Sequence, residues 1–60
     1  MLRFEVYVNN RLAATFLHWK DAADFAENSR IATVIDFDEG TAWFFENDQI
    51  TSTRLAFAEN

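Results

Sequence analysis

The chain has 60 residues, no cysteine and no proline, and a formal net charge of −5. A chain of this length forms one small domain, and here neither a disulfide nor a thiolate-bound metal supplements the core. Half of the residues are hydrophobic and 17% are aromatic, so the chain has enough apolar surface to fold. No apolar run reaches the ~18 residues of a membrane span, and no signal-peptide core follows Met1, so we expect a cytoplasmic domain.

Residues 2–17 are predicted to form a β-hairpin, because apolar and polar residues alternate on both sides of Asn9-Asn10. A two-residue loop would put Phe16 on the face opposite Phe4. A three-residue loop, with an Asn in the left-handed conformation, brings the apolar residues to one face, and burial favours it because a one-residue slip reverses every side chain. The predicted core face carries Leu2, Phe4, Val6, Leu12, Ala14 and Phe16.

Residues 19–29 are predicted to form a helix of about three turns, ending near Asn28-Ser29. Apolar residues recur at the i, i+3, i+4 spacing of a single stripe. Asp21 and Asp24 point away from this stripe and lie near the N-terminal end, where the helix dipole favours anions. The predicted stripe consists of Trp19, Ala22, Ala23, Phe25 and Ala26.

Residues 31–47 are predicted to form a second hairpin, with a three-residue turn, Asp38-Glu39-Gly40, in which Gly40 is left-handed. This loop length pairs Phe37 with Thr41 and assigns the side chains to two faces. The face expected beneath the helix carries Ile31, Thr33, Ile35, Phe37, Trp43 and Phe45. The face expected to be uncovered carries Ala32, Val34, Asp36, Ala42, Phe44 and Glu46, which leaves Phe44 exposed.

Residues 49–60 alternate weakly and are expected to form either a fifth strand after an Asn47-Asp48 turn or a C-terminal arm. The whole sequence, residues 1–60, therefore predicts a single α+β domain of the order β-β-α-β-β, with a possible final strand. A right-handed crossover through the helix places the first strand between the second and the third, so that all neighbouring strands are antiparallel. The helix covers one face of the sheet, and the other face is left to solvent or a partner.

The sequence predicts no enzyme and no catalytic, cofactor-binding or metal-binding residues. His18 is the only histidine, and Ser29 and Ser52 are the only serines, which leaves little material for nucleophilic catalysis. The segment from Asp36 to Gly40 resembles a calcium loop, but its glycine comes one position early and the twelfth position is not Glu. We expect an acidic hairpin turn there instead.

The charges are unevenly distributed, because residues 21–48 contain eight carboxylates and only one basic residue, Arg30. Such a segment repels nucleic acid and anionic membranes and favours a protein partner with a basic surface. The carboxylates also keep an aromatic chain soluble, and this explanation stays open. The predicted partner-binding residues are Asp21, Asp24, Asp36, Asp38, Glu39 and Glu46, with Tyr7 and Phe44 as aromatic anchors.

In size, acidity, lack of cysteine and lack of catalytic residues, the whole chain resembles the small acidic proteins of phages and mobile elements that disable host machinery, anti-CRISPR proteins among them. The resemblance assigns no residue roles. It implies a non-enzymatic inhibitor that binds a basic, nucleic-acid-handling surface of a host protein. The alternative is a self-associating structural protein, in which the uncovered sheet face meets its copy in a dimer.

Overall fold

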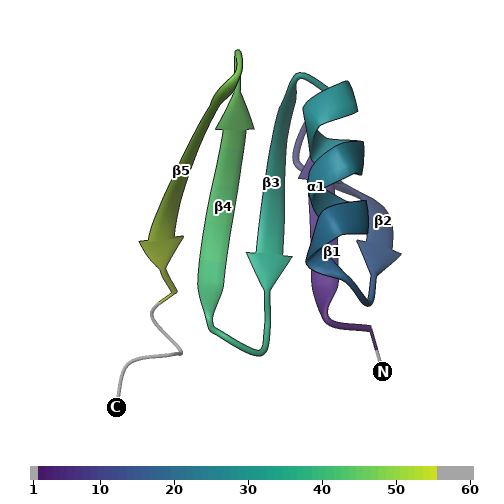
Figure 1. The fold of residues 1–60 in the computed structure, drawn as a ribbon, viewed down its shortest axis with the longest axis vertical. Coiled ribbons are helices and arrows are strands. Elements are labelled where there is room, and N and C mark those ends of the chain that lie inside the picture. The colour runs from purple at the N-terminus through teal and green to yellow at the C-terminus, as the bar shows by residue number, and fades with distance from the viewer. Residues whose placement is uncertain (1, 56–60) are drawn as a thin grey trace.

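Five strands and one helix make up the fold in the computed structural model, which describes residues 2–55. The strands form one antiparallel sheet of order β2-β1-β3-β4-β5, and α1 lies on one face of it (Figure 1). The predicted α+β class and the order of the first four strands are confirmed, and residues 49–54 form a strand. The elements are β1 (Phe4–Val8), β2 (Arg11–Phe16), α1 (Trp19–Asn28), β3 (Ile31–Asp36), β4 (Thr41–Glu46) and β5 (Gln49–Arg54). The rest of the predicted strand or arm, residues 56–60, lies outside the described part.

The three-residue loop predicted for the first hairpin is wrong. Val8 pairs with Arg11 across a two-residue turn, in which Asn9 and Asn10 have φ angles of 55° and 64°. Positive φ at both central positions defines the turn that best matches the twist of paired strands. The apolar residues still reach one face, because the register shifts by one residue between Tyr7 and Val6 on β1 and leaves Ala13 unpaired on β2.

This bulge changes which residues of β2 face the helix. Phe16 pairs with Phe4, and Ala14 pairs with Val6, so both lie on the helix-covered face as predicted. Leu12 precedes the bulge and pairs with Tyr7, so it lies on the opposite face and is exposed. The prediction of Leu12 as a core residue is therefore wrong, and Leu2, also predicted to be core, is exposed before β1 begins.

The helix forms at the residues for which the apolar stripe predicted it. Ala22 and Ala26 are fully buried, and Ala23 and Phe25 pack against the same core. The helix ends at Ser29, whose N–H donates to the Phe25 carbonyl at 3.2 Å, and the chain then leaves the helix through a left-handed residue. The small alanines allow α1 to approach the sheet closely.

The loop of the second hairpin has four residues, 37–40, so the predicted pairing of Phe37 with Thr41 is wrong. Asp36 pairs with Thr41 instead, and the N–H of Gly40, which is left-handed as expected, donates to the Asp36 carbonyl at 2.9 Å. One added loop residue reverses the faces of β3 while those of β4 stay as predicted. Beneath the helix lie Ala32, Val34 and Asp36, and on the opposite face lie Ile31, Thr33 and Ile35.

The core is concentrated under α1, which packs on β1, β2 and β3 (Figure 1). Val6 and Val34 pair at its centre and are fully buried. Trp19, at the start of α1, extends the core towards β4, since its ring lies 5.0 Å from that of Trp43 and 6.0 Å from that of Phe45. The fifth strand lies beyond the helix, and all six of its residues are exposed.

Candidate interaction surface

The sheet face opposite α1, here called the open face, carries a row of side chains that crosses all five strands. Tyr7 on β1 lies between Leu12 and Thr33, and Phe44 on β4 lies between Thr33 and Thr51. Phe44 is 41% exposed and Leu12 is 51% exposed. The structure therefore places Tyr7 and Phe44, the two aromatic residues that the sequence predicted as anchors, on the same face, on either side of Thr33.

Three large apolar residues on this face were not predicted as part of a binding surface: Leu12, Ile31 and Phe37. Ile31 is 59% exposed at one end of the face. At the other end, Phe37 is 49% exposed and rims a shallow hollow with Tyr7 and Ile35. Exposed large apolar residues gathered on one face of a sheet are candidates for a protein-binding surface. The alternation of apolar and polar residues along each strand could have identified them. Which set of residues faces the helix, however, depends on the length of the loop.

Two carboxylates accompany the apolar residues of the open face. Glu5 lies opposite Ile35, and Glu46 lies opposite Ile31. The hydroxyl of Tyr7 donates a hydrogen bond to Glu5 Oε1 at 2.7 Å, and this bond raises the pKa of Tyr7 above its usual value. The aromatic ring of Tyr7 is thus held in place beside a negative charge.

Asp36 is buried on the helix-covered face, so its predicted place on an exposed binding face is wrong. Its carboxylate accepts two hydrogen bonds from Arg3, from Nε at 2.9 Å and from Nη2 at 3.0 Å. The backbone N–H groups of Asp38 and Glu39 donate to Asp36 Oδ1 at 3.0 and 3.3 Å. All of these bonds are internal, so Asp36 organises the loop and presents the next two carboxylates to solvent.

These contacts decide the protonation state of Asp36. Burial acts to raise the pKa of its carboxyl group, but the hydrogen bonds and charge of Arg3, together with the two backbone N–H groups, outweigh burial and hold the pKa below its usual value. The same hydrogen bond raises the pKa of Arg3, which remains charged. Arg3 also lies 3.7 Å from the carboxylate of Asp38, whose side chain is 74% exposed.

The predicted carboxylates do not form one cluster. Asp38 and Glu39 lie at one end of the second hairpin and Glu46 at the other, because strands β3 and β4 separate them. Asp21 and Asp24 are exposed on α1, on the other side of the sheet. A flat partner on the open face can reach Glu46, but it cannot also contact the outer surface of the helix. The carboxylate of Asp38 lies 3.7 Å from Arg3, which pairs with Asp36 on the helix-covered face.

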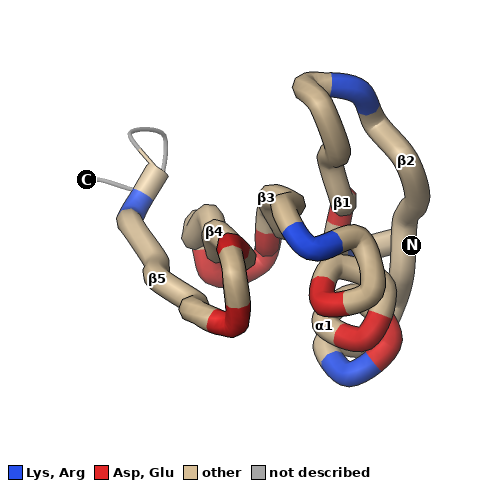
Figure 2. Tube along the Cα trace, turned by 90° about the horizontal axis from the view of Figure 1, so that it is seen from above, with Lys and Arg blue, Asp and Glu red and all other residues tan. Residues whose placement is uncertain are grey.

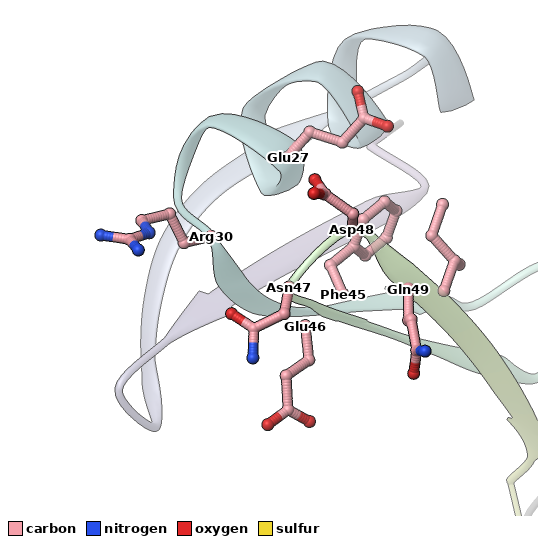
Figure 3. A pocket seen from close by; sticks show the side chains of 8 residues that line it. Glu27, Arg30, Phe45, Glu46, Asn47, Asp48 and Gln49 are labelled. Atoms are coloured by element: carbon pink, nitrogen blue, oxygen red, sulfur yellow. The ribbon is translucent and has the colours of Figure 1, made fainter.

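A hollow of about 440 Å³ lies on the helix side, between the end of α1 and the β4–β5 turn. Glu27, Phe45 and Asp48 line it, whereas the side chains of Arg30 and Glu46 point away from those of Glu27 and Asp48 (Figure 3). It exists because α1 is offset towards β1 and β2, which leaves β5 without a covering layer. The sequence did not indicate this offset or a role for Glu27.

The described residues place no group of three or more His, Asp or Glu side chains where they could hold a metal ion. His18 is exposed at the start of α1, and its side chain makes no capping hydrogen bond there. Ser29 uses its hydroxyl to close the helix, donating to the Phe25 carbonyl at 3.0 Å.

No protein-family model matches the chain, and no curated protein or solved structure is significantly similar to it. Among the described residues, no helix combines the length and the apolar character that crossing a membrane requires.

Proposed function

We propose that the protein is a small non-enzymatic binding module, whose open face docks on a basic surface of a larger protein. The observation that supports this most directly is the row containing Tyr7 and Phe44, with Glu5 and Glu46 on the same face. Aromatic side chains in the centre of a surface, with charged groups around them, have the composition of a protein-binding site.

The two kinds of side chain have different roles in this proposal. Burying Phe44 against a partner is worth roughly 1.5–3 kcal/mol, so the aromatic row supplies affinity. The carboxylates supply orientation and a faster encounter with a basic partner, and their effect decreases with salt. Asp38 and Glu39 contribute from the loop at the end of the sheet, because the internal bonds of Asp36 hold that loop in place.

The class of partner follows from the charge of the molecule. A net charge of −5 opposes direct binding to nucleic acid or to an anionic membrane. Basic protein surfaces are most often those that handle nucleic acid. We therefore infer an inhibitor of such a surface, of the kind that phages and mobile elements direct against host proteins, acting inside the cell.

Affinity capture from a native bacterial lysate, washed at low and at moderate salt, tests this proposal. We expect a nucleic-acid-handling protein to be retained at low salt and partly released at moderate salt. Phe44→Ser should weaken its capture at both salt concentrations, because it removes the central apolar contact. Retention of the same protein by the Phe44→Ser variant to an equal extent would contradict docking through the open face.

Two charge-matched double variants locate the electrostatic contribution. Asp38→Asn with Glu39→Gln and Asp21→Asn with Asp24→Asn both remove two negative charges. The first pair lies in the loop at the end of the sheet and the second on the helix. We expect only the first pair to slow association with the captured protein, as measured by surface plasmon resonance. Equal effects of both pairs would show that net charge alone matters.

The alternative is self-association of two open faces, and the exposure of Leu12, Ile31 and Phe44 favours it. Such a dimer also brings Glu5 and Glu46 of both copies into a shared interface, where like charges are costly. We therefore rank it second. Light scattering tests it: a dimer that Phe44→Asp dissociates would support the alternative.

A further inference from the structure

The strand β5 forms one edge of the sheet, and none of the other described strands pairs with its outer side. One hydrogen bond shows which backbone groups of β5 point outward: the Leu55 N–H donates to the Gly40 carbonyl, on the β4 side, at 2.8 Å. Backbone groups of an antiparallel strand alternate between its two sides. Thr51 and Thr53 therefore direct their N–H and C=O groups towards β4, whereas those of Ile50, Ser52 and Arg54 point outward.

The two edges of the sheet differ in how well they can accept another strand. On β2, the bulge at Ala13 interrupts the regular alternation, which is a common way to protect an edge. On β5, the register with β4 continues without a shift from Gln49 to Arg54. This strand has no proline, no bulge and no carboxylate, so its edge has none of the usual protection apart from Arg54 at its end.

The charge distribution indicates which partner fits this edge. The carboxylates of the described residues lie on β1, β3, β4, α1 and the connecting turns, and none lies on β2 or β5 (Figure 2). For a molecule of net charge −5, approach of an identical molecule is least unfavourable along the two edge strands, β2 and β5, whose only charges are those of Arg11 and Arg54. Of these two edges, only β5 has a register without a bulge. A two-fold axis also closes the assembly at two copies.

We propose that β5 pairs in an antiparallel manner with β5 of a second copy, around a two-fold axis at Ser52. The outward groups allow Ile50 to lie opposite Arg54 of the second copy and Ser52 opposite its own equivalent, which gives about six hydrogen bonds between the chains. A register shifted by one residue would place outward backbone groups of one copy opposite inward groups of the other. The geometry therefore excludes such a register. The result is a ten-stranded sheet in which the two open faces form one continuous surface.

This pairing does not depend on the proposed function, and salt distinguishes the two. Screening weakens the repulsion between two acidic copies, so self-pairing should strengthen as ionic strength rises. Binding of an acidic protein to a basic partner should weaken under the same change. Failure of one expectation therefore leaves the other intact.

Sedimentation velocity over a concentration series, at low and at high salt, tests the pairing. We expect a monomer–dimer equilibrium whose dissociation constant decreases with salt. Ser52→Pro removes an outward N–H without touching the β4 ladder and should weaken the dimer about tenfold or more, since each copy loses a hydrogen bond. Ser52→Ala keeps that N–H and should leave the dimer within about twofold of the wild type. A monomer at every concentration and salt, or assembly beyond the dimer, would overturn the proposal.

Amide hydrogen exchange, followed by NMR, gives a second measurement on the unaltered chain. As concentration rises, the amides of Ile50, Ser52 and Arg54 should gain more protection than those of Thr51 and Thr53, which bond to β4 in the monomer. A dimer without this alternation, or one that Phe44→Asp dissociates while Ser52→Pro does not, would contradict pairing through β5.

Discussion

At the scale of single residues, Asp36 shows how a charged side chain can belong to the core. Asp36 as a whole residue is only 5% exposed. Its carboxylate accepts four hydrogen bonds, two from Arg3 and two from the loop that follows. Arg3 and Asp36 are 33 positions apart in sequence, so this pair fastens the start of β1 to the end of β3. The Arg3 side chain is 36% exposed, so the arginine remains partly hydrated without Asp36, whereas the backbone N–H groups of Asp38 and Glu39 lose the acceptor that holds their loop.

Asp36→Ala should lower the free energy of unfolding by about 2–4 kcal/mol, measured by urea denaturation with tryptophan fluorescence. A domain of this size has only about 3–5 kcal/mol of stability, so the variant should be close to unfolded. Asp38→Ala is the control, because its exposed carboxylate lies 3.7 Å from the same arginine. It should cost less than about 1 kcal/mol, as exposed ion pairs do. Equal costs for both variants would contradict the structural role of Asp36.

The pH dependence of the same pair has a definite sign. The pKa of Asp36 is lower in the folded chain than in the unfolded one, so its contribution is fully present above the ordinary carboxyl pKa of about 4. The contribution decreases as the pH falls below that value towards the lowered pKa. The difference in unfolding free energy between the wild type and Asp36→Asn should therefore shrink on acidification from pH ~6 to pH ~3.

At the scale of elements, the sequence predicted the helix and the strand order but not the registers of the hairpins. The stripe around Ala22 and Ala26 identifies the helix, because its spacing is local. Register depends on loop length, and the four-residue loop is held by the bonds of Asp36, including those from Arg3, a residue distant in the chain. No local pattern reveals that contact, so the faces of β3 were assigned in reverse.

The first hairpin shows the same limit in another form. The need to bury apolar residues predicted that Phe4 and Phe16 share a face, and this is confirmed because the two residues pair directly. The sequence suggested that an odd loop would achieve this, whereas the chain combines an even loop with a bulge at Ala13. Both arrangements insert one extra residue between the apolar positions, so alternation alone cannot distinguish them.

The bulge leads to a prediction at this scale. Deleting Ala13 should restore a regular ladder from Val8–Arg11 to Phe4–Phe16 without moving any core residue. We expect the deletion variant to fold, with a free energy of unfolding within about 1 kcal/mol of the wild type by urea denaturation. It should also associate more strongly in light scattering, because its β2 edge becomes regular.

Deleting Ala32 from β3 is the matched control for this variant. That alanine is buried in an interior strand, so its loss shifts the register against β1 and β4 together and should abolish folding. If the Ala13 deletion unfolds the chain to the same degree, the bulge is required by the fold rather than being an edge device.

At the scale of the whole molecule, the sequence predicted an acidic chain with an exposed Phe44 but not the arrangement of its charges. Strand length separates Glu46 from the loop of Asp38 and Glu39, and the sheet separates both from Asp21. The positions of the carboxylates along the sequence do not reveal these separations in space. The candidate site is therefore smaller than the sequence suggested, and it is centred on the open face.

The offset of α1 also divides the sheet into a covered half and an uncovered half. β1 and β3 contain the fully buried Val6 and Val34, whereas every residue of β5 is exposed and paired on one side only. Strands with few buried contacts open locally at a lower free energy than the global unfolding free energy. Opening of β5 alone should leave the core beneath the helix intact.

Amide hydrogen exchange by NMR, at a concentration low enough to keep the chain monomeric, should therefore show a gradient across the sheet. Thr51 and Thr53 should exchange faster than Val6 and Val34, although all four lie in strands, because β5 can detach without exposing the core. The gradient should persist in Phe44→Ser, which alters the open face but not the position of α1. Equal protection of β5 and β3 would mean that the sheet opens only as one unit, and β5 would then be fixed as firmly as the strands under the helix.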